Sequence, residues 1–554
     1  MKPLAGERMP SGILAGLLAL PLSLPILTII VLALGAGVSA WPHLLSVVLP
    51  PLAWTTLLFC GGSALVTLLL GCTSAWLVAM YRFTGRGMLR WMSLLPLAIP
   101  GYITAFVYVD FFTYAGPFQG WLRGMMGWQR PGDYWFPDIR SLAGAVLVMS
   151  LALYPYVYMS ALAAFVKQPV NQLLAARTLG RSPLRAFLGI TLPQARPAVM
   201  VGLVLVVMEC LNDIGAVSFF GVRTIGYGIY STWLDQGDLG GAAQLALLAL
   251  LFIAMLIWLE QVARVKDGLS RSARASAELP SQRLGGWQAL LAVAVVGLPV
   301  LLGFVLPVLL LLGHGLRRFS TSLTPDLGIA LGNSLLLAFL ACAATLLAGL
   351  VTGHANRWSG SRKLHNLTRF ASLGYALPGT VLGLGILVPL AQFDLGLNQL
   401  TEGLGGWRPG VVLSGGLFGL VLAYVTRFMI IAQGTLDAGY EKIPVAYDQV
   451  ARTLGRHPLR IFRDVHLPLL NPSLITAALL VFVDAMKELP ATLILRPFDF
   501  ETLATRVFTL ASLGQIEEGA ATALAIVVAG LLPVIILARG LRKVLPREQV
   551  FAMP

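Results

Sequence analysis

Long apolar segments separated by short polar breaks run along the whole 554-residue chain. Twelve of these segments are long enough to span a bilayer, which takes about 20 apolar residues in a helix. The predicted spans, with ends uncertain by several residues, are 13–40, 51–81, 89–115, 141–166, 198–222, 240–263, 287–313, 327–353, 366–393, 410–433, 472–496 and 517–540. The break at 264–286 is longer, basic and without apolar periodicity, so we interpret it as a cytoplasmic linker.

The composition supports an all-α polytopic membrane protein. Hydrophobic residues make up 57% of the chain and charged residues 12%, and the mean hydropathy is +0.80. This balance is too apolar for a soluble domain of the same length. The net charge of +14 comes largely from Lys and Arg in short loops between spans, which indicates the positive-inside rule rather than nucleic-acid binding. With both termini on the cytoplasmic side (N-in/C-in), the most basic breaks all share that side.

A 22-residue segment occurs twice in the polar breaks. The first copy, 176–197, reads ARTLGRSPLRAFLGITLPQARP, and the second, 451–472, reads ARTLGRHPLRIFRDVHLPLLNP, with 13 of 22 positions identical. Similarity at offsets of 275 to 278 continues into the spans, so the chain is two fused six-span halves. An even number of spans in each half makes the repeat parallel, related by an axis along the membrane normal. The predicted halves are 1–263 and 287–554, joined by the linker.

Each copy of the segment predicts two short helices that meet at a sharp turn. Gly180 and Gly455 suit a left-handed helix end, and a proline three residues later suits the first turn of the next helix. Ser182 can cap that helix in the first copy, whereas His457 is a poorer cap in the second. An amphipathic loop on the lipid headgroups would not need a fixed sequence with glycine, proline and three arginines. We therefore interpret both loops as docking surfaces for a partner that is itself two-fold.

The spacing A-x3-G-x9-I/V-x-L-P in both loops resembles the EAA loop of ABC-importer permeases. The resemblance implies the type I ABC-importer permease fold, a coupling loop that sits in a groove of an ATPase subunit, and two ATPase copies. It also implies a periplasmic substrate-binding protein, with ATP and Mg on the partner ATPase and no cofactor in this chain. The expected first glutamate is replaced by Leu174 and Gln449. The residues assigned to coupling are Ala176, Arg177, Gly180, Arg181, Arg185, Leu192, Pro193, Ala451, Arg452, Gly455, Arg456, Arg460, Leu467 and Pro468.

Acidic residues occur inside two equivalent spans. At the offset of 275, Glu209 corresponds to Asp484, Asp213 to Glu488, and Asn212 to Lys487. Each acidic pair has i, i+4 spacing and so lies on one helix face. Carboxylates within a membrane are costly unless they are paired or line a wet path. Two interpretations stay open. In the first, the acids cap broken helices or pair with Lys487. In the second, the four acids and Lys487 line the translocation path, and the acids transiently hold a hard cation such as Fe(III).

The stretches that follow these acids narrow the resemblance. KELPATLILRPFDFETLATRVF and ECLNDIGAVSFFGVRTIGYGIYSTW are similar to segments of fused ferric-iron permeases, which implies iron import across a bacterial inner membrane. Thiamine, polyamine, phosphonate and sulfate permeases share parts of these strings and stay as alternative substrate classes. A twelve-span secondary transporter would not need duplicated docking loops. The chain has no P-loop or other catalytic motif, so we predict that it does not itself hydrolyse ATP.

Overall fold

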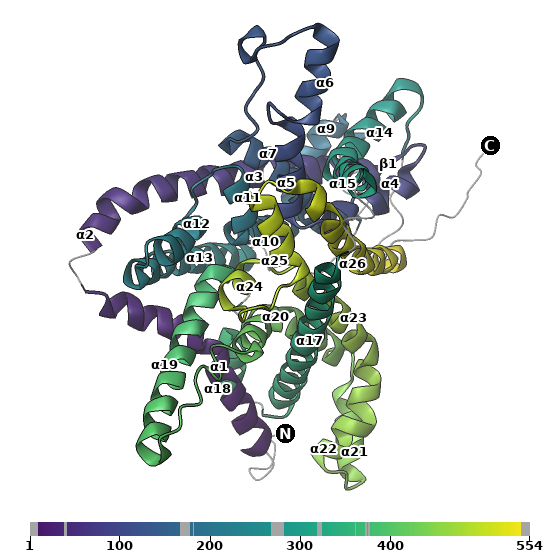
Figure 1. Cartoon of the computed structure of the whole chain (residues 1–554). Coiled ribbons are helices and arrows are strands. Elements are labelled where there is room, and N and C mark those ends of the chain that lie inside the picture. Colours follow the sequence, from purple (N-terminus) through teal and green to yellow (C-terminus); the bar gives the residue numbers. More distant parts are fainter. Residues whose placement is uncertain are drawn as a thin grey trace. The chain divides into compact units, whose positions relative to one another are not determined.

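The computed structural model is almost entirely helical (Figure 1) and describes residues 9–37, 41–166, 178–180, 182–266, 282–317, 324–359, 362–371, 374 and 377–544. Within these residues, β-strands are confined to β1 (Tyr81–Arg82) and β2 (Gln282–Arg283), which pair in parallel. The predicted all-α fold class is confirmed.

Ten of the twelve predicted spans correspond to single long apolar helices, and the other two correspond to a bent pair of helices and to a shorter helix. In the described part of the chain, ten helices are long and apolar enough to cross a membrane. Arg86–Ala98 and Gly101–Met126 are apolar enough to cross only when taken together, and they are bent by 90°, as in a broken span or a re-entrant loop. The sixth predicted span, 240–263, corresponds to the shorter apolar helix Leu239–Met255, the first part of α13 (Leu239–Lys266).

The third predicted span, 89–115, is interrupted in the structure. A 3-10 turn at Leu95–Ala98 ends at Ile99, whose backbone is extended, and α5 (Gly101–Phe112) then starts after Pro100. Proline disfavours helical geometry at the residue before it and lacks the N–H that a continuing helix would need. The break therefore lies at the proline.

Three further boundaries differ from the prediction because polar or proline residues interrupt apolar runs. The span predicted at 366–393 starts at Gly379, after Pro378, and the separate amphipathic helix α18 (Arg362–Ala371) precedes it. The spans predicted at 198–222 and 472–496 each end about ten residues early, at a charged break described below. Hydrophobicity alone does not detect these breaks because the residues on both sides are apolar.

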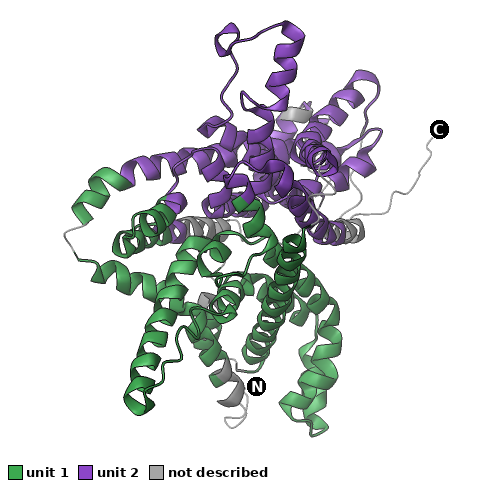
Figure 2. Ribbon diagram, in the orientation of Figure 1, with its two compact units in different colours: residues 1–48, 228–250, 323–509 green, residues 49–227, 251–322, 510–554 purple. Residues whose placement is uncertain are grey.

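The chain forms two compact units, coloured separately in Figure 2. Unit 1 comprises 1–48, 228–250 and 323–509, and unit 2 comprises 49–227, 251–322 and 510–554. Unit 1 thus combines the central helices of the second sequence half with α1 from the first. Unit 2 combines the central helices of the first half with the beginning and end of the second. The compact units and the sequence halves have different boundaries, and the halves stay a prediction.

In unit 2, α3 packs against α7, α10 and α14, while α26 packs against α15 and the 3-10 turn Leu95–Ala98. Its helices are α3 (Leu49–Met80), α4 (Arg86–Met92), α5, α6 (Pro117–Met126), α7 (Leu142–Val166), α9 (Pro183–Ala186), α10 (Leu192–Asn212), α11 (Ile214–Phe219), α14 (Gly286–Val300), α15 (Leu306–Arg317) and α26 (Ile516–Val544). Short helix α12 (Ile225–Tyr230) and α13 continue from unit 2 into residues of unit 1 and back.

In unit 1, α17 packs against α20 and α23, and α1 lies along α17 and α19. Its helices are α1 (Met9–Gly35), α2 (Trp41–His43), α17 (Pro325–Ser359), α18, α19 (Gly379–Gly405), α20 (Leu417–Tyr440), α21 (Val445–Thr453), α22 (Pro458–Ile461), α23 (Leu467–Met486), α24 (Pro490–Leu495) and most of α25 (Leu503–Ser512). On α1, Ala15 and Ala19 are buried while Leu17 and Leu20 are exposed. This pattern is typical of membrane helices, whose small residues allow close packing while larger apolar residues face lipid.

Candidate docking loops and translocation residues

Both repeated loops contain the predicted turn. Gly180 and Gly455 have φ of 77° and 72°, the left-handed conformation expected at a helix end. The Arg185 backbone N–H donates to the hydroxyl of Ser182 over 3.4 Å, whereas His457 makes no side-chain cap. Each turn is followed by a short helix that begins with proline, and a π-helical segment then leads into α10 or α23.

The two loops expose an equivalent apolar side chain beside the glycine. Leu179 is 82% exposed and Leu454, its counterpart at the offset of 275, is 73% exposed. The two loops thus present the same apolar side chain at equivalent positions, as two docking surfaces for identical partners would require. Arg185, Arg456 and Arg460 are also exposed on these loops.

The remaining predicted coupling residues fall into three groups. Leu192 and Pro193, and likewise Leu467 and Pro468, begin the long helices α10 and α23. Ala451 is buried against Trp358 and Ile461, and the Arg452 guanidinium stacks over the Trp358 ring at 4.4 Å, so these residues contact the membrane helices. Three residues lie outside the described residues: Ala176, Arg177 and Arg181.

A charged cluster next to the second loop was not predicted, because its residues are not part of the repeated loop motif. The Arg357 guanidinium, at the end of α17, pairs with Asp448 over 2.8 Å and donates to the carbonyls of Tyr440 and Ile443, both over 3.0 Å. His466 Nε2 donates to the other oxygen of Asp448 over 2.6 Å. Burial alone would raise the pKa of Asp448. The hydrogen bonds from His466 and Arg357 and the charge of Arg357 outweigh this effect, so the pKa lies below its ordinary value.

The acids of the two charged spans lie where those helices break. In unit 2, α10 ends at Asn212, and the Asp213 carboxylate accepts a hydrogen bond of 2.8 Å from the Ala216 N–H in the first turn of α11. In unit 1, α23 ends at Met486, and the Glu488 carboxylate accepts one of 3.2 Å from the Ala491 N–H in α24. Ala216 and Ala491 are themselves equivalent at the offset of 275. Asp213 and Glu488 therefore cap broken helices, as one of the two interpretations predicts.

A glycine from another helix lies directly against each break. A Cβ at Gly101, the first residue of α5, would collide with the Asp213 carboxylate. A Cβ at Gly379, the first residue of α19, would lie 2.7 Å from Pro490 Cβ and 3.1 Å from Glu488 Oε1. Both glycines follow a proline in the repeated sequence, so the same close approach is built twice. We call each glycine with its capping acid a junction.

The junction of unit 1 carries extra charges. Arg427 of α20 pairs with Glu488 over 3.0 Å, and their side chains are only 6% and 5% exposed. Asp484 pairs with Lys487 over 2.8 Å, which the sequence predicted as one alternative. Glu209 and Asp213 belong to unit 2, and Asp484 and Glu488 to unit 1, so the proposed approach of all four acids stays a prediction. Among the described residues, no group of three or more His, Cys, Asp or Glu side chains could hold a metal ion.

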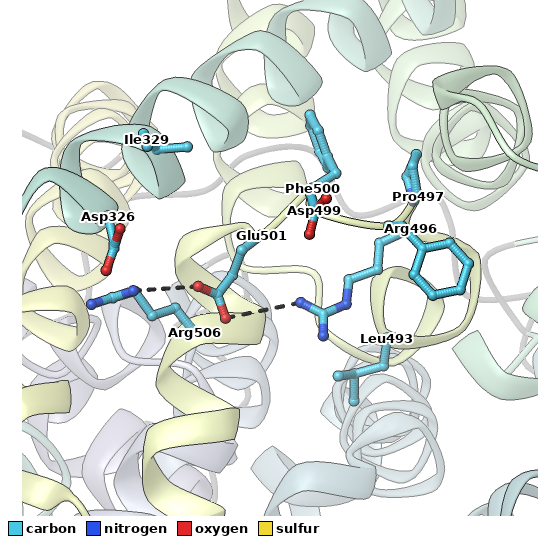
Figure 3. A pocket seen from close by; sticks show the side chains of 10 residues that line it. Asp326, Ile329, Leu493, Arg496, Pro497, Asp499, Phe500, Glu501 and Arg506 are labelled. Atoms are coloured by element: carbon cyan, nitrogen blue, oxygen red, sulfur yellow. Dashed lines mark hydrogen bonds and ion pairs between the residues drawn. The ribbon is translucent and has the colours of Figure 1, made fainter.

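A charged pocket follows this segment in unit 1 (Figure 3). It has a volume of about 540 Å³ and lies between the start of α17 and the connection from α24 to α25. Glu501 lies between two guanidiniums, 3.3 Å from Arg506 and 4.0 Å from Arg496, while Asp326 and Asp499 add two more carboxylates. Arg357 follows Asp326 by 31 positions on α17, which is about 46 Å at a rise of 1.5 Å per residue and exceeds the hydrocarbon core of about 30 Å. The pocket and the Asp448 cluster lie at opposite ends of α17, and therefore on opposite sides of a membrane that α17 spans.

Comparison with known proteins identifies the class of protein. The family described as "Binding-protein-dependent transport system inner membrane component" matches residues 67–266 and 345–549, so the chain belongs to this family, with its domain duplicated. It is a multi-pass inner-membrane permease of the ABC type, and such permeases are not catalytic by themselves.

Relatives match the chain over different lengths. The Fe(3+)-transport system permease protein FbpB 2 of Haemophilus influenzae is 26% identical over 538 residues, which are 94% of this chain and 96% of the relative. The sulfate permease CysW of Escherichia coli is 29% identical over 37% of this chain and 72% of its own length. The molybdenum permease ModB of Escherichia coli is 29% identical over 37% of this chain and 91% of its own length.

Proposed function

We propose that this chain is the permease of an ATP-driven importer that carries ferric iron received from a periplasmic binding protein. FbpB 2, a ferric-iron permease by name, matches the chain across both halves, whereas CysW and ModB match about a third of it. Carboxylates that line the path would also favour a cation over sulfate or molybdate.

Each repeated loop would receive one copy of a cytoplasmic ATPase that binds ATP and Mg. The observation that carries this proposal is the equivalent exposure of Leu179 and Leu454 beside left-handed glycines. Two equal ATPase subunits need two similar surfaces, and a fused permease can supply both from one chain. ATP-driven movement of the loops would open the path between the halves, through which the acids would pass the cation without holding it in a closed cage.

Docking is tested by replacing the exposed leucines. Leu179→Asp with Leu454→Asp should abolish co-purification of the ATPase, because a carboxylate would have to be desolvated in an apolar contact. Each single variant should weaken it partially. Leu404→Asp is the matched control and should leave co-purification unchanged. Leu404 is 81% exposed and lies near the C-terminal end of α19, away from both loops in the sequence. Wild-type co-purification in the double variant would contradict docking through these loops.

The cargo is tested in proteoliposomes that contain the permease and its ATPase. ATP hydrolysis and uptake of radioactive iron should rise with a binding protein loaded with Fe(III), and should not rise with the empty protein. Stimulation by a sulfate-loaded or molybdate-loaded binding protein alone would transfer the proposal to those cargoes. Uptake driven by a proton gradient without the ATPase would instead indicate a secondary transporter.

A further inference from the structure

The second repeated loop has two distinct faces. On α21, Asp448 and Ala451 are one helical turn apart and buried, whereas Val445, Tyr447 and Val450 are exposed. The exposed face continues into Leu454. The buried face therefore joins the loop to the membrane helices, and the apolar face is left for a partner.

The guanidinium of Arg357 makes several hydrogen bonds to the buried face and to the residues just before it. Arg357 uses three of its N–H groups on Asp448 and on two carbonyls of the connection between α20 and α21. Guanidinium forks hold carboxylates in a defined orientation, unlike a lysine ammonium. Asp448 in turn accepts from His466, which is fully buried at the base of α23. Three segments, the end of α17, the start of the loop and the base of α23, are thus connected through a single carboxylate.

Aromatic rings shield the cluster from water. The Tyr440 and His466 rings lie 5.6 Å apart, and the Trp358 and His466 rings 6.2 Å apart. Arg452 stacks over the outer side of Trp358. Hydrogen bonds between ionised groups are stronger in such a low-dielectric environment, and the loss of one partner is correspondingly more costly.

The first repeated loop lacks both the acidic acceptor and the histidine donor of this cluster. At the offset of 275, Asp448 corresponds to Leu173 and His466 to Thr191. Leucine cannot accept from a guanidinium, so the sequence of the first loop rules out the same cluster. The acid at 448 stands immediately before Gln449, the position at which the loop motif normally has its glutamate.

We propose that Arg357, Asp448 and His466 are positioning residues that fix the second loop to α17, so that its apolar face meets the ATPase in one orientation, while the first loop docks without this clamp. The inference rests on the proposed function of the loops. It implies that the two loops contribute unequally to coupling, although their exposed surfaces are alike.

The test uses the whole complex of permease, ATPase and binding protein in nanodiscs. Asp448→Asn keeps the side-chain size but removes the charge that pairs with Arg357. We expect ATPase co-purification and basal ATP hydrolysis to persist, and the maximal stimulation by loaded binding protein to fall at least five-fold. The binding-protein concentration for half-maximal stimulation should not change, because the external face is untouched. Backbone hydrogen exchange in α21 should increase in the same variant.

Two further variants make the result decisive. Glu441→Gln removes an exposed acid just before the loop and should behave as wild type. Arg357→Lys keeps the charge but loses the fork, and should give an intermediate loss of stimulation; it decides the question if Asp448→Asn fails to fold. Wild-type stimulation and exchange in Arg357→Lys or Asp448→Asn would overturn the inference. If the wild-type complex shows no stimulation by loaded binding protein, the proposed function fails. Hydrogen exchange still tests the clamp in that case, because unchanged exchange of α21 in Asp448→Asn would refute it.

Discussion

Asp213 and Glu488 lie at equivalent breaks of the two charged spans, and each carboxylate caps the short helix that follows. Their surroundings differ in charge. Glu488 pairs with Arg427, whereas the residue that corresponds to Arg427 at the offset of 275 is Ala152. The two loops also differ in charge, because Asp448 and His466 of the second loop correspond to Leu173 and Thr191 of the first. The two breaks thus share one backbone design, and the second half has charged or titratable residues where the first has alanine, leucine and threonine.

The largest effect should come from the charge that distinguishes the second junction. Arg427→Met leaves Glu488 buried without its cation and should destabilise the protein by about 3–5 kcal/mol. Thermal unfolding of the purified permease in detergent measures this. Arg408→Met breaks an exposed pair with Glu402 and is the control, with an expected cost of about 1 kcal/mol or less. Equal costs for the two variants would mean that the buried pair adds nothing to the second junction.

The glycines test whether the two junctions are equally tight. Gly379→Ala should cost about 1–3 kcal/mol, since the new methyl group meets Pro490 Cβ at 2.7 Å and a backbone nitrogen at 2.8 Å. Gly101→Ala should cost less, because the Asp213 and Met149 side chains can move. Gly87→Ala, in α4 with open space around it, is the control and should be neutral or stabilising. The reverse order of the first two variants would contradict the comparison.

The cap at the first junction should be recoverable by an uncharged residue. Asp213→Ala removes the acceptor of the Ala216 N–H and should cost about 1 kcal/mol, whereas Asp213→Asn should restore most of this stability. Unfolding temperatures of both variants give the measurement. If Asn behaves like Ala, the negative charge of Asp213 matters more than the cap, and a role in the translocation path gains support.

The smallest effect is a pH dependence confined to the second loop. Arg357 from α17 and His466 from the base of α23 face Asp448, with Tyr440 nearby, and the pKa of the carboxyl lies below its ordinary 3.8. Its contribution to stability is therefore fully present above about pH 4 and is lost as the pH falls through the lowered pKa. Hydrogen exchange in α21, corrected for intrinsic rates, should rise below about pH 4. In Asp448→Asn this extra rise should be missing; its persistence would assign the effect to another group.

The sequence predicted features that depend on neighbouring residues. The left-handed turns at Gly180 and Gly455 and the cap by Ser182 follow from short-range steric and hydrogen-bonding preferences. The pair of Arg427 with Glu488 joins residues 61 positions apart, and that of Arg357 with Asp448 joins residues 91 apart. No local pattern specifies such partners. The bend at Pro100 was missed because apolar residues on both sides concealed a helix break that the proline itself signals.

The position of α1 in unit 1 has a consequence for biogenesis. Its packing partner α17 begins 290 residues after α1 ends. At about 5–20 residues per second, the ribosome needs roughly 15–60 s to make that intervening chain. During this delay α1 must reside in the bilayer without the helix it will pack against. Its high mean hydropathy of 2.6 allows this, because lipid satisfies an apolar helix whose backbone hydrogen bonds are internal. Helix α1 thus stays without this partner until the second half is made, and unit 1 is completed only late in synthesis.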